Sequence, residues 1–215
     1  MKTYYATDAF DKNVADYDSW YDAHPEVYAS ELRAIRAHFE RLPENIHGIE
    51  VGLGTGRFSV PLGIREGVEP SAPMAAKAIS RGVEVMDARA EKLPYGDMQF
   101  DFVLFVTICH LQSLKYAFRE AHRVLKPKGL IIVGFLPKDQ PVAHGYQERR
   151  RFSTFYREAV FYTPEEIGKL LAESGFKSPE YNQVLFGPLE SIKEAEEPKP
   201  GFGKGSFVVV SAEKG

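Results

Sequence analysis

Apolar residues recur with two different periods along this chain of 215 residues. Short continuous apolar runs are typical of buried strands, and apolar residues that return every three or four positions are typical of amphipathic helices. Strands are predicted at 46–51, 83–86, 100–107, 130–135, 181–186 and 206–211, with a shorter one ending at Val68. Helices are predicted at 27–42, 55–62, 71–82, 114–125 and 163–175. This alternation indicates a parallel sheet covered by helices on both faces.

Residues that begin and end helices lie where these elements need them. Gly63 follows the helix predicted to end at residue 62, and Ser71 can cap the helix that follows it. Thr163, Pro164 and Glu166 form the pattern of a capping box with proline at the first helical position. We therefore expect a doubly wound α/β domain with a mostly parallel sheet of seven strands.

Composition and charge narrow the function classes. The net charge of −3 gives no basic excess for holding a polyanion, so we expect no nucleic-acid partner and favour a small-molecule substrate. Cys109 is the only cysteine, which excludes an intramolecular disulfide. No signal-peptide pattern opens the chain and no apolar run approaches the ~18 residues of a membrane span, so we expect a cytoplasmic protein without membrane contact. The histidines have no metal-ligand spacing, and we expect no metal.

The chemical signal is a glycine-rich turn between a predicted strand and a predicted helix. Glu50 precedes it, and Gly52, Gly54 and Gly56 alternate with Leu53 and Thr55. Glycines allow a ligand to approach the backbone closely where the chain turns sharply. In a doubly wound sheet, ligands bind at the carboxyl ends of the strands, which is where this turn lies.

Details of the turn distinguish between nucleotide ligands. A dinucleotide fingerprint would have its third glycine where this chain has Arg57, and the lysine of a phosphate loop is absent. The carboxylate of Glu50 would repel a diphosphate and suits a ligand with a positive amino group. A nicotinamide-dependent oxidoreductase is therefore a disfavoured alternative.

The turn resembles the first motif of class I S-adenosylmethionine-dependent methyltransferases, and the resemblance continues in order over roughly residues 8–190, especially to the small-molecule (type 11-like) branch. It implies that Glu69, in Gly67–Ser71, accepts hydrogen bonds from both ribose hydroxyls, and that Met74 packs on adenine. Asp87 would accept from the adenine amino group, while the Ala88 N–H meets a ring nitrogen. The implied cofactor-binding residues are Glu50, Gly52, Leu53, Gly54, Gly56, Glu69, Pro70, Met74, Asp87, Ala88, Val106 and Tyr17.

Two further stretches match the same family. The run 99–107, followed by His110, resembles its fourth strand, whose end at Val106 borders the methionine part of the cofactor. The run 123–129 resembles its helix-to-strand turn, although Lys128 stands where glycine is usual.

The resemblance implies methyl transfer from S-adenosylmethionine to a small-molecule acceptor. Such transfer depends mainly on positioning and exclusion of water, and His110 is the candidate for a general base, with a neutral lining residue as the alternative. A regulatory protein that binds the cofactor without turnover is another alternative, because these motifs indicate binding only.

The implied organisation is a single methyltransferase domain. Residues 1–45 would form an N-terminal lid and helix, 46–136 the cofactor-binding core, 137–162 a substrate-cover insertion, and 163–215 a C-terminal helix with closing strands. Tyr17 and Trp20 either close over the cofactor, with a cation–π contact to the sulfonium, or pack permanently on the helix at 27–42. The arginines at 149–151 are expected on a solvated face, with contact to an anionic acceptor as the alternative.

Overall fold

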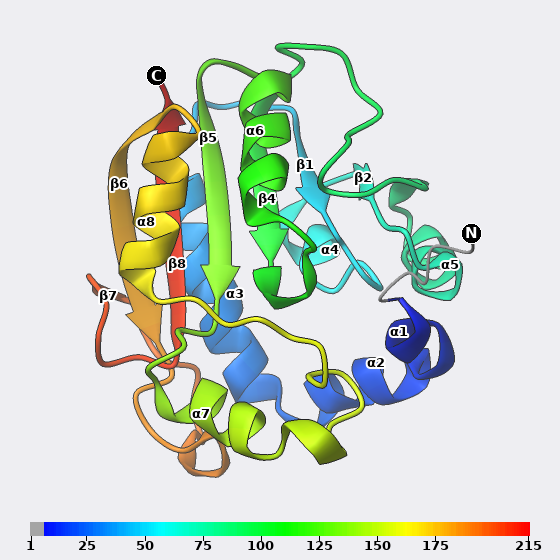
Figure 1. Cartoon of the computed structure of the whole chain (residues 1–215), viewed down its shortest axis with the longest axis vertical. Coiled ribbons are helices and arrows are strands. Elements are labelled where there is room, and N and C mark those ends of the chain that lie inside the picture. Colours follow the sequence, from blue (N-terminus) through cyan, green and yellow to red (C-terminus); the bar gives the residue numbers. More distant parts are fainter. Residues whose placement is uncertain (1–6) are drawn as a thin grey trace.

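The structure is a computed structural model that describes residues 7–215, so the first six residues of the expected lid at 1–45 lie outside the described residues. One sheet of eight strands runs through the molecule in the order β3-β2-β1-β4-β5-β8-β6-β7 (Figure 1). The strands are β1 (Gly48–Val51), β2 (Glu66–Val68), β3 (Glu84–Met86), β4 (Phe100–Val106), β5 (Leu125–Phe135), β6 (Phe176–Val184), β7 (Lys199–Pro200) and β8 (Phe207–Lys214). Strands β1 to β5 pair in parallel, and β8 pairs antiparallel with both β5 and β6.

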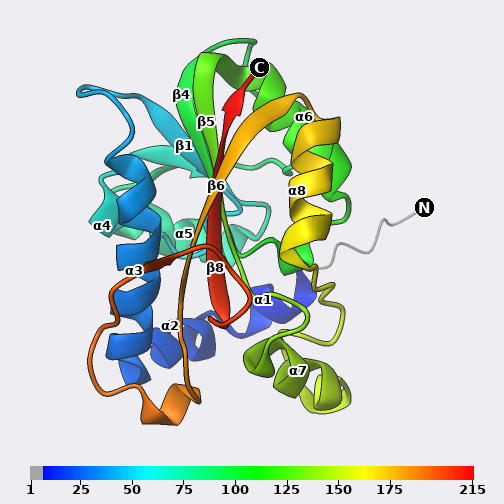
Figure 2. The ribbon, with the colours of Figure 1, turned by 90° about the vertical axis from the view of Figure 1, so that its left-hand side faces the viewer.

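Helices cover both faces of the sheet. They are α1 (Asp8–Lys12), α2 (Val14–Ala23), α3 (Pro25–Phe39), α4 (Ser59–Leu62), α5 (Ala72–Ser80), α6 (Leu114–Val124), α7 (Pro141–Glu148) and α8 (Pro164–Glu173). Figure 2 shows α3, α4 and α5 on one face and α6 and α8 on the other. Among residues 7–215, no helix combines the length and apolar character that crossing a membrane requires. The predicted doubly wound, mostly parallel fold is confirmed.

Three differences from the predicted elements have local causes. The two-residue strand β7 at the sheet edge adds an eighth strand, too short to show in the sequence. The helix predicted at 55–62 begins only at Ser59, because Gly56 has a left-handed φ of 76° that no helix accepts. The strand predicted at 181–186 begins at Phe176, because pairing with β8 extends it beyond the apolar run.

Helix α3 carries polar residues on its buried side. Val27, Ala34 and Ile35 pack in the core as the apolar spacing predicts, but Glu31 and His38 occupy the same buried stripe. His38 lies beside Ser211 of β8, with Nδ1 2.8 Å from Oγ. The carboxyl group of Glu31 is also buried, but unlike His38 it has no hydrogen-bond partner among the described residues.

Three helices lie at the carboxyl ends of the parallel strands: α1 and α2 of the N-terminal segment, and α7 of the insertion after β5. Strands β1, β4 and β5 point toward the end of the molecule where α1, α2 and α7 lie (Figure 1). The sheet order reverses between β1 and β4, which is where doubly wound folds form their ligand crevice. The fold thus brings the glycine-rich turn, the N-terminal helices and the segment 136–163 to one place.

Candidate functional site

The glycine-rich turn follows β1 in a conformation that its glycines permit. Gly52, Gly54 and Gly56 all have left-handed φ angles, of 72°, 56° and 76°. A Cβ at Gly52 would meet open space, and one at Gly54 would lie 3.4 Å from the Tyr17 hydroxyl. One at Gly56 would lie 3.3 Å from the Cβ of Ala78, so this glycine serves close packing against α5. Backbone geometry therefore favours glycine at all three positions, and close packing adds to it at Gly56.

Glu50 is fully buried at the end of β1, below the turn. The Ser59 hydroxyl donates to Oε2, whereas Oε1 has no partner among the described residues. Burial raises the pKa of Glu50 to about 8, against the opposing effect of the Ser59 hydrogen bond. A carboxyl oxygen that is buried and unsatisfied fits a ligand that brings a donor, such as an amino group.

Glu69 joins the turn to the end of β2. Its Oε2 accepts a hydrogen bond from the Gly54 N–H at 2.9 Å and its Oε1 accepts one from the Ser71 N–H at 2.8 Å. Burial raises the pKa of Glu69, these two bonds lower it, and the charge of Asp11 raises it further. Each carboxylate oxygen still has a lone pair for a further donor, which fits a pair of ribose hydroxyls.

A cavity of about 370 Å³ opens beside the turn. It lies within the size range of small-molecule sites. Nine of the sequence-predicted site residues contribute to its lining, namely Gly52, Gly54, Glu69, Pro70, Met74, Ala88, Val106, Tyr17 and His110. Four others lie outside the lining, namely Glu50, Leu53, Gly56 and Asp87. Leu53 packs with Ala78 and Val83 beneath α5, and the Asp87 side chain is exposed beyond β3.

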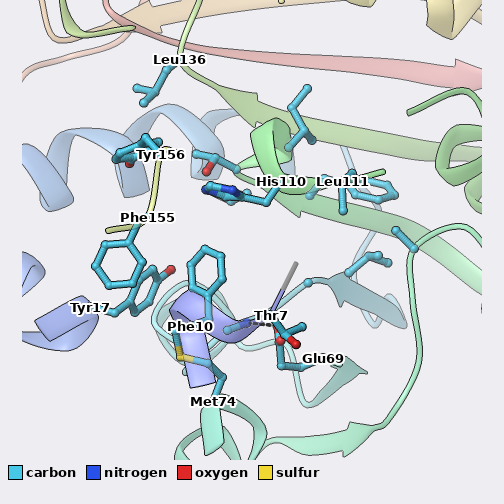
Figure 3. Close-up of a pocket in the computed structure, with 18 of the residues that line it drawn as sticks. Thr7, Phe10, Tyr17, Glu69, Met74, His110, Leu111, Leu136, Phe155 and Tyr156 are labelled. Carbon is cyan, nitrogen blue, oxygen red and sulfur yellow. Dashed lines mark hydrogen bonds between the residues drawn. The ribbon is translucent and has the colours of Figure 1, made fainter. Parts of the chain in front are cut away.

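The other end of the cavity is aromatic. Figure 3 shows Phe10 between His110 and Met74, with Tyr17 and Phe155 to one side. Phe10 contacts the His110 ring edge-on at a centroid distance of 4.9 Å, and the Tyr17 hydroxyl lies 3.3 Å from that of Tyr21. The glycine-rich turn and an aromatic compartment therefore share one cavity.

His110 closes a short 3-10 helix, Ile108–His110, after β4. Its ring packs against Phe10 and, at 5.7 Å between centroids, against Tyr156. Burial lowers the pKa of His110 to about 4, so the imidazole is neutral near pH 7. A neutral imidazole in the cavity wall can accept a proton from a ligand.

Some lining residues come from segments that the sequence assigns only as a whole. Tyr146 and Tyr156, which stack at 3.9 Å between centroids, belong to the insertion at 137–162, whose tyrosines and phenylalanines predict a partly aromatic pocket. Glu31 lines the cavity from α3, where a carboxylate on an otherwise apolar helical stripe could have indicated it. The arginines at 149–151 are exposed and none of them lines the cavity, which agrees with a solvated face.

Comparisons with known proteins agree with this arrangement. The model of the methyltransferase domain family matches residues 49–133, which span β1 to most of β5. A solved S-adenosylmethionine-dependent methyltransferase of Thermotoga maritima, described as a possible histamine N-methyltransferase, is 39% identical. It superposes with a TM-score of 0.93, over 98% of this chain and 100% of that one.

Two further proteins extend the comparison. An uncharacterized protein of Methanocaldococcus jannaschii is 39% identical over 206 residues, which are 95% of this chain and 98% of that one. A geranyl diphosphate C-methyltransferase of Streptomyces coelicolor, solved with S-adenosyl-L-homocysteine, is 17% identical over 86% of this chain and 78% of that one. Its TM-score of 0.65 shows a shared fold. The S-adenosylmethionine-dependent enzyme of Thermotoga maritima aligns with nearly the whole of this chain. S-adenosylmethionine is therefore the cofactor of this chain as well. The chain belongs to the class I S-adenosylmethionine-dependent methyltransferases, in the type 11 group.

Proposed function

We propose that this enzyme transfers the methyl group of S-adenosylmethionine to a small-molecule acceptor held in the aromatic end of the cavity. The observation that carries the proposal is the continuity of that cavity. Gly52, Gly54 and Glu69 line it together with aromatic side chains, and Figure 3 shows Tyr156 and Leu136 on the side away from Glu69 and Met74. A site of about 370 Å³ suits a small molecule and leaves little room for a macromolecular segment.

We assign the cofactor to the end of the cavity beside the glycine-rich turn, where acidic, apolar and backbone groups could each contact one part of it. Glu69 would accept from the ribose hydroxyls, Met74 would pack on adenine, and the Ala88 N–H would meet the adenine ring. Glu50 would hold the amino group from below the turn, since its Oε1 is buried without a partner. Pro70 and Val106 would shape the walls, Leu53 and Gly56 would support the turn from outside the lining, and Asp87 would have to turn inward to reach the adenine amino group.

The acceptor end is assigned to the insertion at 137–162, because Val142, Tyr146, Phe155 and Tyr156 of that segment line the cavity. The cofactor supplies a methyl group already activated by its sulfonium. The chain then has to align the acceptor with that group and exclude water, which can account for most of the rate. His110, neutral near pH 7, would act as a weak base that takes the proton lost by an oxygen or nitrogen acceptor.

Calorimetry and label transfer test the proposal. The purified chain is expected to bind S-adenosylmethionine and S-adenosylhomocysteine, and to bind NAD at least about tenfold more weakly. Incubation with methyl-labelled S-adenosylmethionine and a metabolite extract is expected to label a small molecule. Histamine is the first single acceptor to test, because the Thermotoga relative is described as a possible histamine N-methyltransferase. Tighter binding of NAD, or label found only on protein or RNA, would contradict the proposal.

A further inference from the structure

A carboxyl group lies in the acceptor end of the cavity without a compensating partner. Glu31 lines the cavity from α3 and is 6% exposed. No group among residues 7–215 donates a hydrogen bond to its carboxylate or pairs with it, and burial alone raises the pKa of Glu31 to about 8. A buried carboxyl group without a partner is costly to the free protein, so a ligand that compensates it gains affinity.

The other acids of the lining have partners or contact solvent. Glu69 accepts from two backbone N–H groups, and Glu91 accepts from the Ser113 N–H at 3.0 Å. Asp16 is exposed at the surface of α2. Glu31 is therefore the acid of the described lining that is both buried and unsatisfied.

Aromatic side chains pack beside the part of α3 that carries Glu31. Glu31 lies one turn after Val27, and Val27 belongs to the apolar cluster that Trp20, Tyr21, Tyr146 and Tyr156 pack against. Trp20 packs edge-on against Tyr21 at 5.1 Å between centroids and also lines the cavity. Tyrosine and tryptophan faces attract cations, and here they accompany a carboxylate.

The ionisable side chains of the described lining, tyrosines aside, are mostly acids. Asp16, Glu31, Glu69 and Glu91 are its acids, whereas Arg89 is the permanently positive residue among its described members. Arg89 donates to Gln112 at 2.9 Å, next to the end of the cavity that Ala88 lines. Glu31 is protonated in the free protein near pH 7, and a cationic ligand favours its ionised form whereas an anionic ligand opposes ionisation.

We propose that Glu31 binds the cationic amino group of the methyl acceptor, which makes the acceptor an apolar or aromatic amine. This inference rests on the proposed function, because it names the substrate class of the same cavity. The ammonium group pairs with the ionised Glu31 carboxylate inside the cavity, whose lining also includes Trp20 and Tyr21. The apolar part packs on the aliphatic side chains that line the same end, Leu136, Val142 and Leu185. An alcohol of the same skeleton leaves Glu31 unsatisfied, and a carboxylic acid places two negative charges together.

Matched ligands test the charge preference. Phenethylamine, 2-phenylethanol and phenylacetate share a skeleton and differ in charge, and butylamine and 1-butanol form a second pair. Each is titrated into the protein saturated with S-adenosylhomocysteine. The amines are expected to bind at least about tenfold more tightly than the alcohols, and phenylacetate more weakly still. Equal affinity for amine and alcohol, or no binding of either amine, overturns the proposal.

Two substitutions assign the preference to one residue. Glu31→Gln keeps the shape and removes the charge, and is expected to reduce the affinity for both amines at least about tenfold while leaving the alcohols unchanged. Glu26→Gln, on the first turn of the same helix and outside the cavity lining, is the matched control and should change neither. An unchanged amine affinity in Glu31→Gln overturns the role of Glu31.

The binding of S-adenosylhomocysteine separates this inference from the proposed function. Glu31 is not among the residues assigned to the cofactor, so Glu31→Gln is expected to keep the affinity for S-adenosylhomocysteine within about twofold. Failure of the unaltered protein to bind S-adenosylhomocysteine counts against the proposed function. Normal binding of S-adenosylhomocysteine without preference for amines counts against the amine acceptor alone.

Discussion

Arg81 holds the Asp18 carboxylate with two hydrogen bonds, from Nη2 to Oδ2 at 2.6 Å and from Nη1 to Oδ1 at 3.2 Å. Asp18 lies on α2, and Arg81 follows α5, so the contact ties the N-terminal segment to the cofactor half of the sheet. Thr55 Oγ1 and Arg57 Nε donate to the same carboxylate, at 2.7 and 3.0 Å. The segment proposed as a lid is therefore anchored directly to the glycine-rich turn.

The substitution Asp18→Asn should weaken both the fold and the cofactor site. It leaves the guanidinium groups of Arg57 and Arg81 without their shared anion, and we expect a loss of about 3 kcal/mol in the free energy of unfolding. Because Thr55 belongs to the turn, the affinity for S-adenosylhomocysteine should also fall. Urea denaturation and calorimetry measure the two effects. Asp16→Asn, on the same helix but exposed, is the control and should alter stability little.

Glu69→Ala should reduce the affinity for S-adenosylhomocysteine by about 1.5–3 kcal/mol, the scale of hydrogen bonds to a charged group. The variant also loses the hydrogen bonds from Gly54 and Ser71, so calorimetry should be accompanied by a melting curve. Glu69→Gln preserves the shape and one acceptor oxygen, and its loss should be smaller. If Glu69→Ala binds S-adenosylhomocysteine as tightly as the unaltered protein, Glu69 does not hold the ribose.

The free protein should lose stability as pH rises from about 6.5 to about 8. Burial raises the pKa of Glu31 and of Glu50 to about 8 in the folded chain, and their usual value is 4.5. Between these values the unfolded chain has released the protons that the folded chain retains, so each carboxyl lowers the free energy of unfolding with rising pH, by at most about 1.4 kcal/mol per pH unit.

Two histidines work in the opposite direction at lower pH. Burial lowers the pKa of His38 and of His110 to about 4 from the usual 6.5, so the unfolded chain binds protons there that the folded chain does not. Because of these two histidines, the free energy of unfolding rises with pH up to about 6.5. This rise offsets the decrease that the two carboxyl groups cause in the same range. Denaturation curves from pH 5 to 8.5 should show the fall only above about pH 6.5. Glu31→Gln should reduce its slope, and a slope unchanged in that variant would contradict the assignment.

Much of the fold was readable from the sequence because local and long-range signals agree. The apolar runs, the Ser71 cap and the Thr163 capping box all appear as expected, the last with both of its hydrogen bonds. Lys128 shows why a departure from the family pattern is tolerated. It adopts the left-handed φ of 64° that glycine usually supplies, at a modest energetic cost.

The acceptor end was less readable, because its residues come together only through tertiary structure. Tyr21 lies on α2, whereas Tyr146 and Tyr156 lie in the insertion at 137–162, and nothing in their spacing indicates a surface shared with α2. Glu31 lies four residues after Val27 on the buried stripe of α3, and the sequence does not show that this part of the stripe lines a cavity. The glycine-rich turn was recognisable because its chemistry is contained in consecutive residues.

Trp20 fluorescence should report whether the N-terminal segment responds to the cofactor. Trp20 is the only tryptophan and lines the cavity, stacked on His24 at 4.6 Å between centroids. Tyr17, three residues earlier on α2, approaches the glycine-rich turn at Gly54 and contacts Phe10 and Phe155. The structure thus offers contacts on both sides, to α3 through Tyr21 and Tyr28 and to the cofactor end through Tyr17.

If the segment closes on the cofactor, saturation with S-adenosylhomocysteine should shift or quench the Trp20 emission, because it changes the packing and hydration around the indole. Tyr17→Ala should then weaken S-adenosylmethionine more than S-adenosylhomocysteine, since a cation–π contact to the sulfonium is worth about 0.5–2 kcal/mol and the uncharged product lacks it. Tyr28→Phe, which keeps the ring that packs on Phe58, is the control and should preserve the ratio of the two affinities. Constant emission at saturation, together with equal losses for both ligands in Tyr17→Ala, would identify the segment as a permanent wall of the cavity, held by Asp18 whether or not the cofactor is bound.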